Sequence, residues 1–151
     1  GDQVRAAVSD WALPVTVVTG ESSRYDAFAA SSAALAASGT VALELAMARV
    51  PYTIAYKMNP LSSCLLRILV KGKYANLVNI LADREVVKEY LLEYCRPELL
   101  VPEVERLLSD EAYRETQIRD AFGVLKSLGA EEHETPSRKA ADILLEMTGR
   151  V

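Results

Sequence analysis

The turn Ser38-Gly39-Thr40 carries residue types that can bind a phosphate group. It separates a short apolar run, which predicts a buried strand, from a run that predicts a helix. In an open α/β sheet ligands bind at the carboxyl ends of the strands, and a helix N-terminus presents unpaired N–H groups to an anion. Glycine lets the backbone approach a ligand closely, and the two hydroxyls add donors. The turn is therefore a candidate anion site, with a simple helix cap as the alternative.

Glu44 is the second candidate, because it lies one turn beyond Thr40 on the same face of the predicted helix. Its neighbours Leu43 and Leu45 are apolar, and a carboxylate in a largely apolar helix needs a partner. A bidentate acceptor near a phosphate site suits the two hydroxyls of a ribose. The alternative is a glutamate on the solvent face of an amphipathic helix.

Three weaker candidates follow along the chain. Asn79 is an amide in an apolar run, where it could contact a ligand or fix a backbone turn, and the residues alone favour the turn. Arg84 stands at a predicted helix start and could face a phosphate, although exposure to solvent is the simpler interpretation. Tyr56, at the end of a predicted strand, is a further candidate for contact with the same ligand.

These residues must be positioned by alternating strands and helices in the first half of the chain. Residues 14–19, 33–37 and 52–56 are short runs of small or β-branched residues that predict buried strands. Residues 22–32, with Ser22 or Ser23 as N-cap, and residues 40–49, capped by Thr40, predict the helices between them. The pattern indicates an α/β fold, with a parallel sheet covered by helices on both faces.

The second half of the chain is expected to be mainly helical, apart from a short strand or extended loop at residues 76–81. We therefore divide the chain into an α/β core at residues 1–81 and a helical tail at residues 82–151. The predicted helices are residues 61–70, 86–94, 97–108, 111–128 and 137–147. Prolines stand near three of the predicted starts, at Pro97, Pro102 and Pro136.

Composition excludes several classes of function. Seventeen basic residues against 21 acidic ones give a net charge of −4, which argues against a nucleic-acid-binding protein. The single histidine, His133, and the two distant cysteines, Cys64 and Cys95, do not have the spacing of a metal site. No run approaches the ~20 apolar residues of a transmembrane helix.

Several motifs resemble the C-terminal half of the bacterial lipid-A-disaccharide synthase family. Their order and spacing, more than any single motif, make the resemblance specific, and it is strongest over residues 29–97. The motifs are the segment from Ser38 to Glu44, Val50-Pro51, Ala55-Tyr56-Lys57, Asn59-Pro60-Leu61, Lys73-Tyr74, the segment from Asn76 to Leu81, Asp83-Arg84-Glu85 and Val87-Lys88-Glu89.

The resemblance implies a GT-B-type glycosyltransferase with two Rossmann-like domains, of which this chain is part of the C-terminal, donor-binding one. The family joins UDP-2,3-diacylglucosamine to 2,3-diacylglucosamine 1-phosphate and releases UDP, with no metal and no cofactor. By the same resemblance, Ser38-Gly39-Thr40 would lie against the UDP diphosphate. Glu44 would accept from the ribose hydroxyls, and Asn79 would help hold the nucleotide.

The chain also departs from the family pattern. The family's glycine–serine–arginine phosphate loop is absent, as is the N-terminal acceptor domain with its presumed catalytic carboxylate, so we assign no catalytic residue to this chain. We expect a sheet truncated at its N-terminal edge, an inactive isolated chain and weak UDP binding. Within the matched part, Val78 replaces a usual proline and Leu92 a usual glutamine.

Partners and location follow from the resemblance and from the incomplete sheet. The acylated substrates imply a cytoplasmic enzyme peripheral to the inner membrane, and the basic edge of residues 61–73 could touch that membrane, with a core helix as the alternative. A sheet that lacks its first strand predicts a homodimer, with exchange of the C-terminal helices as one route. Alternatives are another UDP-sugar enzyme, such as an epimerase or a peptidoglycan-precursor transferase, or a non-enzymatic helical interaction module.

Overall fold

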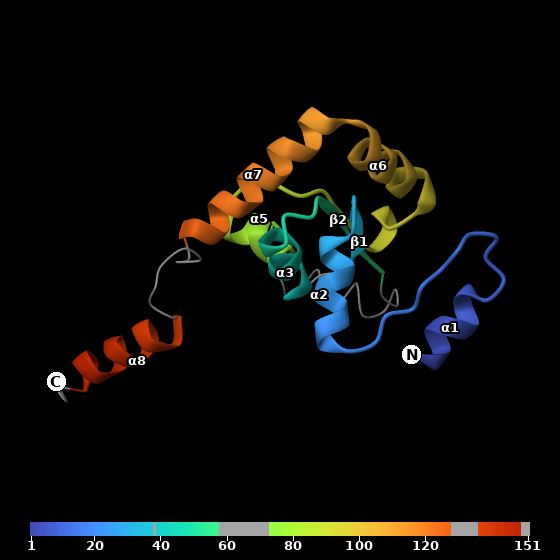
Figure 1. Cartoon of the computed structure of the whole chain (residues 1–151). Helices are drawn as coiled ribbons and strands as arrows, with labels where there is room; N and C mark the ends of the chain where they lie inside the picture. The colour runs from blue at the N-terminus through green and yellow to red at the C-terminus, as the bar shows by residue number, and fades with distance from the viewer. Residues whose placement is uncertain (38, 58–72, 128–135, 149–151) are drawn as a thin grey trace.

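A computed structural model of the chain describes residues 1–37, 39–57, 73–127 and 136–148. Several features named from the sequence lie outside these ranges: Ser38, the Asn59-Pro60-Leu61 motif, the predicted helix at residues 61–70 with Cys64, and His133. The described chain begins with a short helix, α1 (Asp2–Val8), and ends with a separate helix, α8 (Pro136–Met147) (Figure 1).

The centre of the fold is a three-stranded parallel sheet in the order β1-β2-β3. The strands are β1 (Ala34–Ala36), β2 (Tyr52–Tyr56) and β3 (Glu89–Leu91). The register pairs Ala34 with Tyr52 and Ile54 with Glu89, so β2 is the central strand. The predicted α/β class with a parallel sheet and flanking helices is confirmed, as are the strands at residues 33–37 and 52–56, although Leu35 of β1 is 55% exposed.

Helices α2 (Glu21–Ala29) and α3 (Val41–Met47) flank β1 in the chain. Both were predicted, but α2 begins after Gly20 and has no side-chain cap among the described residues, so neither Ser22 nor Ser23 is its N-cap. Helix α3 packs against β1 and against α7 (Glu111–Ser127). Its buried residues, Ala42, Leu45 and Ala46, join Tyr52, Ile54, Val78, Val87, Ala121 and Leu125 in one hydrophobic core.

The predicted strand at residues 14–19 is wrong. This stretch is irregular, it pairs with none of the described strands, and Val15 and Val18 are 42% and 41% exposed. β-branched residues favour a strand because they pack well on a pleated, half-buried surface, not because their backbone is extended by itself. Without a pairing edge beside it, this run has the residue types of a strand but no ladder to join.

The prediction of a strand or extended loop at residues 76–81 is also wrong, because helix α5 (Leu77–Ala82) occupies this run. The Asn76 side chain caps the helix by accepting a hydrogen bond from the Val78 N–H at 3.0 Å. The helix ends at Asp83, whose φ of 47° is left-handed. Asparagine as an N-cap and a left-handed C-cap are ordinary helix boundaries, and they outweigh the apolar run that suggested a strand.

The predicted helix at residues 86–94 is replaced by β3 and a single 3₁₀ turn, η1 (Leu92–Tyr94). The segment completes the sheet by pairing with β2, so tertiary pairing overrides the local helical pattern. The third strand therefore lies beyond residue 81, in the part where only helices were expected. In the described sheet β2 pairs with β1 on one edge and with β3 on the other.

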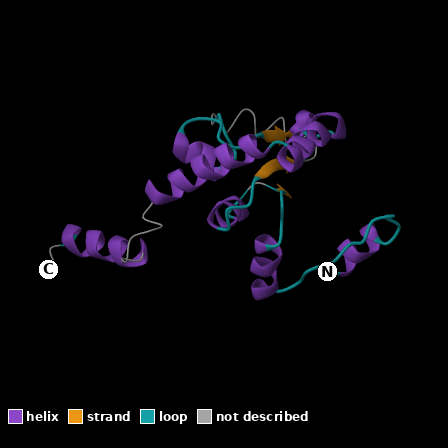
Figure 2. Cartoon of the chain, turned by 45° about the horizontal axis from the view of Figure 1, so that its top comes forward, coloured by secondary structure: helices purple, strands orange, loops and turns teal. Residues whose placement is uncertain are grey.

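The remaining predicted helices are confirmed as α6 (Pro97–Ser109), α7 and α8. Pro97 starts α6, whereas Pro102 lies inside it and not near a helix start. The Asp110 carboxylate accepts from the Tyr113 N–H at 3.0 Å at the start of α7, and this hydrogen bond lowers the pKa of Asp110. Helix α8 lies apart from the sheet in both views (Figure 1, Figure 2). None of the described helices is long and apolar enough to span a membrane.

Candidate functional site

Gly39, in the turn after β1, has a backbone conformation that favours glycine. Gly39 has a φ of 136°, a conformation that side chains disfavour, whereas a Cβ added at this residue would meet no atom within 4 Å. Glycine is therefore required there by backbone conformation and not by lack of space. Thr40 occupies the N-cap position of α3, but within the described residues its side chain makes no capping hydrogen bond. The exposed Thr40 hydroxyl thus has no structural task in the cap.

Glu44 has the partner that a carboxylate in an apolar helix needs, and that partner is Arg24 of α2. Arg24 Nη2 lies 3.3 Å from Glu44 Oε2, and the two side chains are 42% and 23% exposed. Despite this contact, Arg24 Nε and Glu44 Oε2 are buried without a hydrogen-bond partner among the described residues. The pair is therefore a loose ion pair with unused hydrogen-bonding capacity. Sequence reasoning missed Arg24, because nothing in its local pattern indicates which helix it faces.

A groove of about 530 Å³ is lined by Arg24 of this pair, whereas Glu44 is not among its lining residues. Its lining residues come from the end of the irregular stretch and from α2: Val18, Gly20, Glu21, Arg24, Ala27 and Phe28. Arg24 thus contacts Glu44 and also lines an open groove.

Asn79 has a different environment from Glu44, since its side chain is completely buried. Its amide Nδ2 donates to the Val87 carbonyl at 2.7 Å and to Glu89 Oε1 at 2.6 Å. Its Oδ1 accepts from the N–H groups of Val86 and Val87 at 2.8 and 2.9 Å. These four hydrogen bonds use both amide hydrogens and both acceptor positions. The turn-fixing role that the residues alone favoured is confirmed, and a ligand contact of Asn79 stays a prediction.

Glu89 is the centre of a polar network that sequence reasoning missed. Its carboxylate accepts from the N–H groups of Ala75 and Asn76 at 2.8 and 3.1 Å, in addition to Asn79. The Asn76 amide in turn donates to the Tyr52 hydroxyl at 3.4 Å. Burial raises the pKa of Tyr52 to about 12; the Asn76 hydrogen bond opposes this shift and the charge of Glu89 adds to it. The network ties α5 to both β2 and β3.

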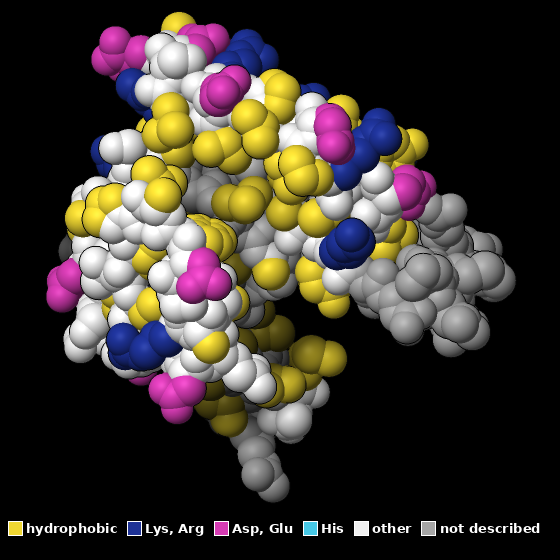
Figure 3. Space-filling model, turned by 90° about the vertical axis from the view of Figure 1, so that its right-hand side faces the viewer, with side chains coloured by type: hydrophobic (Ala, Val, Ile, Leu, Met, Phe, Trp, Pro, Cys, Tyr) yellow, Lys and Arg dark blue, Asp and Glu magenta, His cyan; other side chains and the backbone are white. Residues whose placement is uncertain are grey.

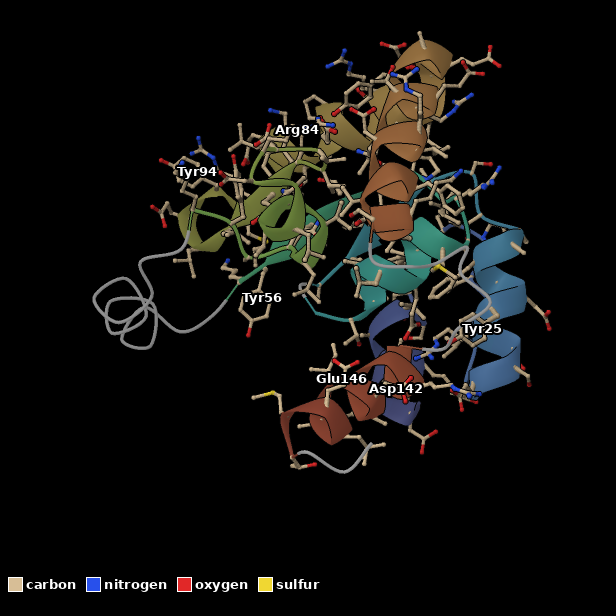
Figure 4. The ribbon with its side chains drawn as sticks, turned by 90° about the vertical axis from the view of Figure 1, so that its left-hand side faces the viewer. Tyr25, Tyr56, Arg84, Tyr94, Asp142 and Glu146 are labelled. Atoms are coloured by element: carbon tan, nitrogen blue, oxygen red, sulfur yellow. The ribbon has the colours of Figure 1, made fainter. Side chains whose placement is uncertain are left out.

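The other two candidates lie elsewhere. Arg84 Nη2 donates to Asp120 Oδ2 of α7 at 2.9 Å, an exposed contact that anchors the loop after α5. Tyr56 is 39% exposed at the end of β2. Figure 4 shows these two side chains well apart from each other. Among the described residues Glu44 of α3 pairs with Arg24 of α2, whereas Asn79 bonds to Val86, Val87 and Glu89 and Arg84 bonds to Asp120.

The arrangement supports recognition of a polar anionic ligand more than bond-making chemistry. Glu44 offers carboxylate oxygens, Arg24 offers guanidinium donors, and Thr40 offers a hydroxyl at a helix start. Within the described ranges no group of three or more histidine, cysteine, aspartate or glutamate residues could hold a metal ion.

Comparison with known proteins gives a consistent result. The family model described as lipid-A-disaccharide synthetase matches residues 3–143. A lipid-A-disaccharide synthase of Rhodospirillum centenum is 47% identical over 144 residues, which cover 95% of this chain and 36% of that protein.

Two further relatives extend this picture. The synthase of Paramagnetospirillum magneticum is 50% identical over 147 residues, covering 96% of this chain and 37% of that protein. A probable mitochondrial lipid-A-disaccharide synthase of Arabidopsis thaliana is 38% identical over 159 residues, covering 94% of this chain and 35% of that protein. The chain therefore spans a little over a third of the length of these curated relatives.

Proposed function

The chain belongs to the lipid-A-disaccharide synthetase family, and on that premise we propose that it is part of the donor-binding domain of a hexosyltransferase. The proposed reaction joins UDP-2,3-diacylglucosamine to 2,3-diacylglucosamine 1-phosphate, forms the lipid A disaccharide and releases UDP. The names of the relatives support the reaction, and the parallel sheet supports a Rossmann-like, C-terminal domain of a GT-B-type enzyme. The acceptor would bind mainly through the part of the relatives that this chain does not match.

The donor site that we propose lies at the turn between β1 and α3. Ser38, Gly39 and Thr40 would contact the UDP diphosphate, and Glu44 would accept hydrogen bonds from the ribose hydroxyls. The observation that carries this proposal is the state of Glu44: a partly exposed carboxylate, one turn beyond a left-handed glycine, with a buried oxygen that has no hydrogen-bond partner among the described residues. A buried carboxylate oxygen without a hydrogen bond is costly, and the exposed part of the same carboxylate can accept hydrogen bonds from ribose hydroxyls.

Asn79, Arg84 and Tyr56 remain weaker candidates for donor contacts. Asn79 would have to give up hydrogen bonds to Val86, Val87 or Glu89 before it could reach a ligand. Arg84 would have to leave Asp120. Tyr56 needs no such change, because its side chain is already partly exposed.

Two further parts of the proposal concern assembly and location. We place the enzyme in the cytoplasm, peripheral to the inner membrane, because its substrates carry acyl chains. We also propose a homodimer, in which α8 is exchanged between protomers. Helix α8 exposes apolar residues, with Leu144 63% and Met147 80% exposed, and hydrophobic side chains also gather on the face shown in Figure 3. Sedimentation that gives a monomer throughout the micromolar range would contradict the dimer.

The test of the proposed function is disaccharide synthesis by the complete enzyme that contains this chain. We expect Glu44→Ala to lower the rate at least about tenfold, equivalent to about 1.4 kcal/mol of transition-state stabilisation. The control is Arg119→Ala, an arginine of α7 whose side chain is 72% exposed, which should keep the wild-type rate. Full activity of Glu44→Ala would contradict the proposed donor site. A wild-type enzyme that forms no disaccharide would contradict the proposed reaction.

A further inference from the structure

We propose that Arg24 is a further binding residue of the donor site, which holds the Glu44 carboxylate and together with it binds the ribose hydroxyls of a bound nucleoside diphosphate. This inference rests on the proposed function, and it adds a residue from a different helix to the site. Arg24 is the fourth residue of α2 and Glu44 the fourth residue of α3. Their contact therefore joins two helices that are consecutive among the described helices.

The geometry of the pair is that of an incomplete ion pair. A tight arginine–carboxylate contact is bidentate, with N···O distances of ~2.7–2.9 Å. Arg24 and Glu44 instead make one contact of 3.3 Å, while Arg24 Nε and Glu44 Oε2 are buried with no hydrogen-bond partner among the described residues. The side chains are close enough to fix each other's orientation, and neither has used its full hydrogen-bonding capacity.

The two side chains, which are 42% and 23% exposed, match the chemistry of a vicinal diol. A hydroxyl group both donates and accepts, whereas a carboxylate only accepts and a guanidinium only donates. A ribose hydroxyl placed between the two side chains can donate to Glu44 and accept from Arg24 at the same time. Two apolar or two like-charged side chains at these positions would not offer this combination.

The surroundings of Arg24 hold its guanidinium at the edge of an open groove. The guanidinium carbon lies 5.2 Å from the centre of the Tyr25 ring, and Tyr25 packs edge-on against Phe28 with ring centres 6.1 Å apart. Tyr25 lies on α2 with its side chain at the surface (Figure 4). Arg24 and Phe28 both line the groove of about 530 Å³, a size within the range of ~300–1,000 Å³ that small-molecule sites occupy. The cation is thus restrained at a place that a ligand can enter.

The test compares UDP with 2′-deoxy-UDP as ligands of the complete enzyme, measured by isothermal titration calorimetry. Glu44 and Arg24 act on the ribose hydroxyls, so the ratio of the two dissociation constants reports their function directly. We expect wild-type protein to bind UDP about tenfold more tightly than 2′-deoxy-UDP, because the deoxy ligand leaves a buried acceptor unpaired. A general loss of protein stability would weaken the binding of both ligands and leave the ratio of their dissociation constants unchanged.

In Arg24→Ala we expect the ratio to fall to about two or less, as in Glu44→Ala, and the double variant to resemble either single one, because the two residues act as a unit. Arg24→Lys keeps the charge but lacks the planar fork of donors, so it should restore part of the ratio. Arg119→Ala is the matched control and should retain the wild-type ratio.

Three other results would contradict parts of this proposal. A ratio lost in Glu44→Ala but kept in Arg24→Ala overturns the role of Arg24 and leaves the proposed donor site intact. If the wild-type protein binds UDP and 2′-deoxy-UDP equally tightly, the proposed roles of both Arg24 and Glu44 in binding the ribose are overturned. A complete enzyme that binds neither nucleotide overturns the proposed function itself, and with it this inference.

Discussion

Two polar groups of the chain, Asn79 on α5 and Glu44 on α3, both stood out in the sequence as polar residues among apolar neighbours. The structure gives them opposite environments. Asn79 is fully buried and makes four hydrogen bonds. Glu44 is partly exposed, has one ion-pair contact and keeps a buried oxygen without a hydrogen bond among the described residues.

The comparison separates what holds the fold from what is available to a ligand. A buried amide whose donors and acceptors are all paired stabilises the backbone that it bonds, and binding a ligand would cost those bonds. A partly exposed carboxylate with unused hydrogen-bonding capacity can gain hydrogen bonds when a ligand binds. Substitution of Asn79 should therefore change the stability of the fold, and substitution of Glu44 should change ligand binding.

The largest effect is expected from Asn79→Ala. The change leaves the Val86 and Val87 N–H groups, the Val87 carbonyl and the Glu89 carboxylate without their partner, and should lower the free energy of unfolding by about 3 kcal/mol. Urea denaturation measures this loss. Ile80→Ala on the same helix is the control: Ile80 is 49% exposed, so its truncation should cost under about 1 kcal/mol. An Asn79→Ala protein as stable as wild type would show that the network is not what holds this connection.

A smaller, pH-dependent effect is expected from Tyr52. Its pKa in the folded chain is about 12, above the value of ~10 in an unfolded chain. Between these two values the unfolded state has lost the proton and the folded state keeps it, so the stabilisation is complete below about pH 10 and falls as pH rises toward 12. The loss is about 1.4 kcal/mol per pH unit for one such group.

Tyr52→Phe isolates this contribution, because Tyr90 and Tyr113, whose pKa values are also raised, remain in both proteins. Denaturation at a series of pH values should give a shallower alkaline decline for the variant than for the wild type. Parallel declines above about pH 10 would mean that Tyr52 is accessible to solvent, and the buried network would then have to be redrawn.

The smallest effect on stability is expected from Arg24→Ala. Its contact with Glu44 is single and partly exposed, and such ion pairs contribute about 0–1 kcal/mol, less at high salt. The unfolding free energy of this variant should therefore stay within about 1 kcal/mol of wild type in the same denaturation experiment. A loss of stability comparable with that of Asn79→Ala would show that the Arg24–Glu44 pair holds the fold together, as the Asn79 hydrogen bonds do.

Sequence reasoning identified the elements whose signal is local. The strand at Tyr52–Tyr56 and helices α3, α6, α7 and α8 follow from apolar periodicity and from residues at their ends. It failed at three places where the outcome depends on distant partners or on a single cap. Residues 14–19 have the composition of a strand but no pairing edge, residues 86–94 join β2 as β3 instead of forming a helix, and Asn76 turns the run after it into α5.

The candidate site was predictable to a similar degree. Gly39, Thr40 and Glu44 became candidates because they lie close together in the sequence. The contacts of Arg24 and Glu89 were missed because they form only when α2 meets α3 and when β3 meets α5. A network assembled from separate segments leaves no spacing in the sequence that would indicate it.

The most direct test of the account is UDP binding by the complete enzyme, measured together with its unfolding free energy, for Glu44→Ala and wild type. We expect Glu44→Ala to raise the dissociation constant for UDP about tenfold, or about 1.4 kcal/mol, while its unfolding free energy stays within about 1 kcal/mol of wild type. Wild-type affinity for UDP in a folded Glu44→Ala protein would contradict this expectation.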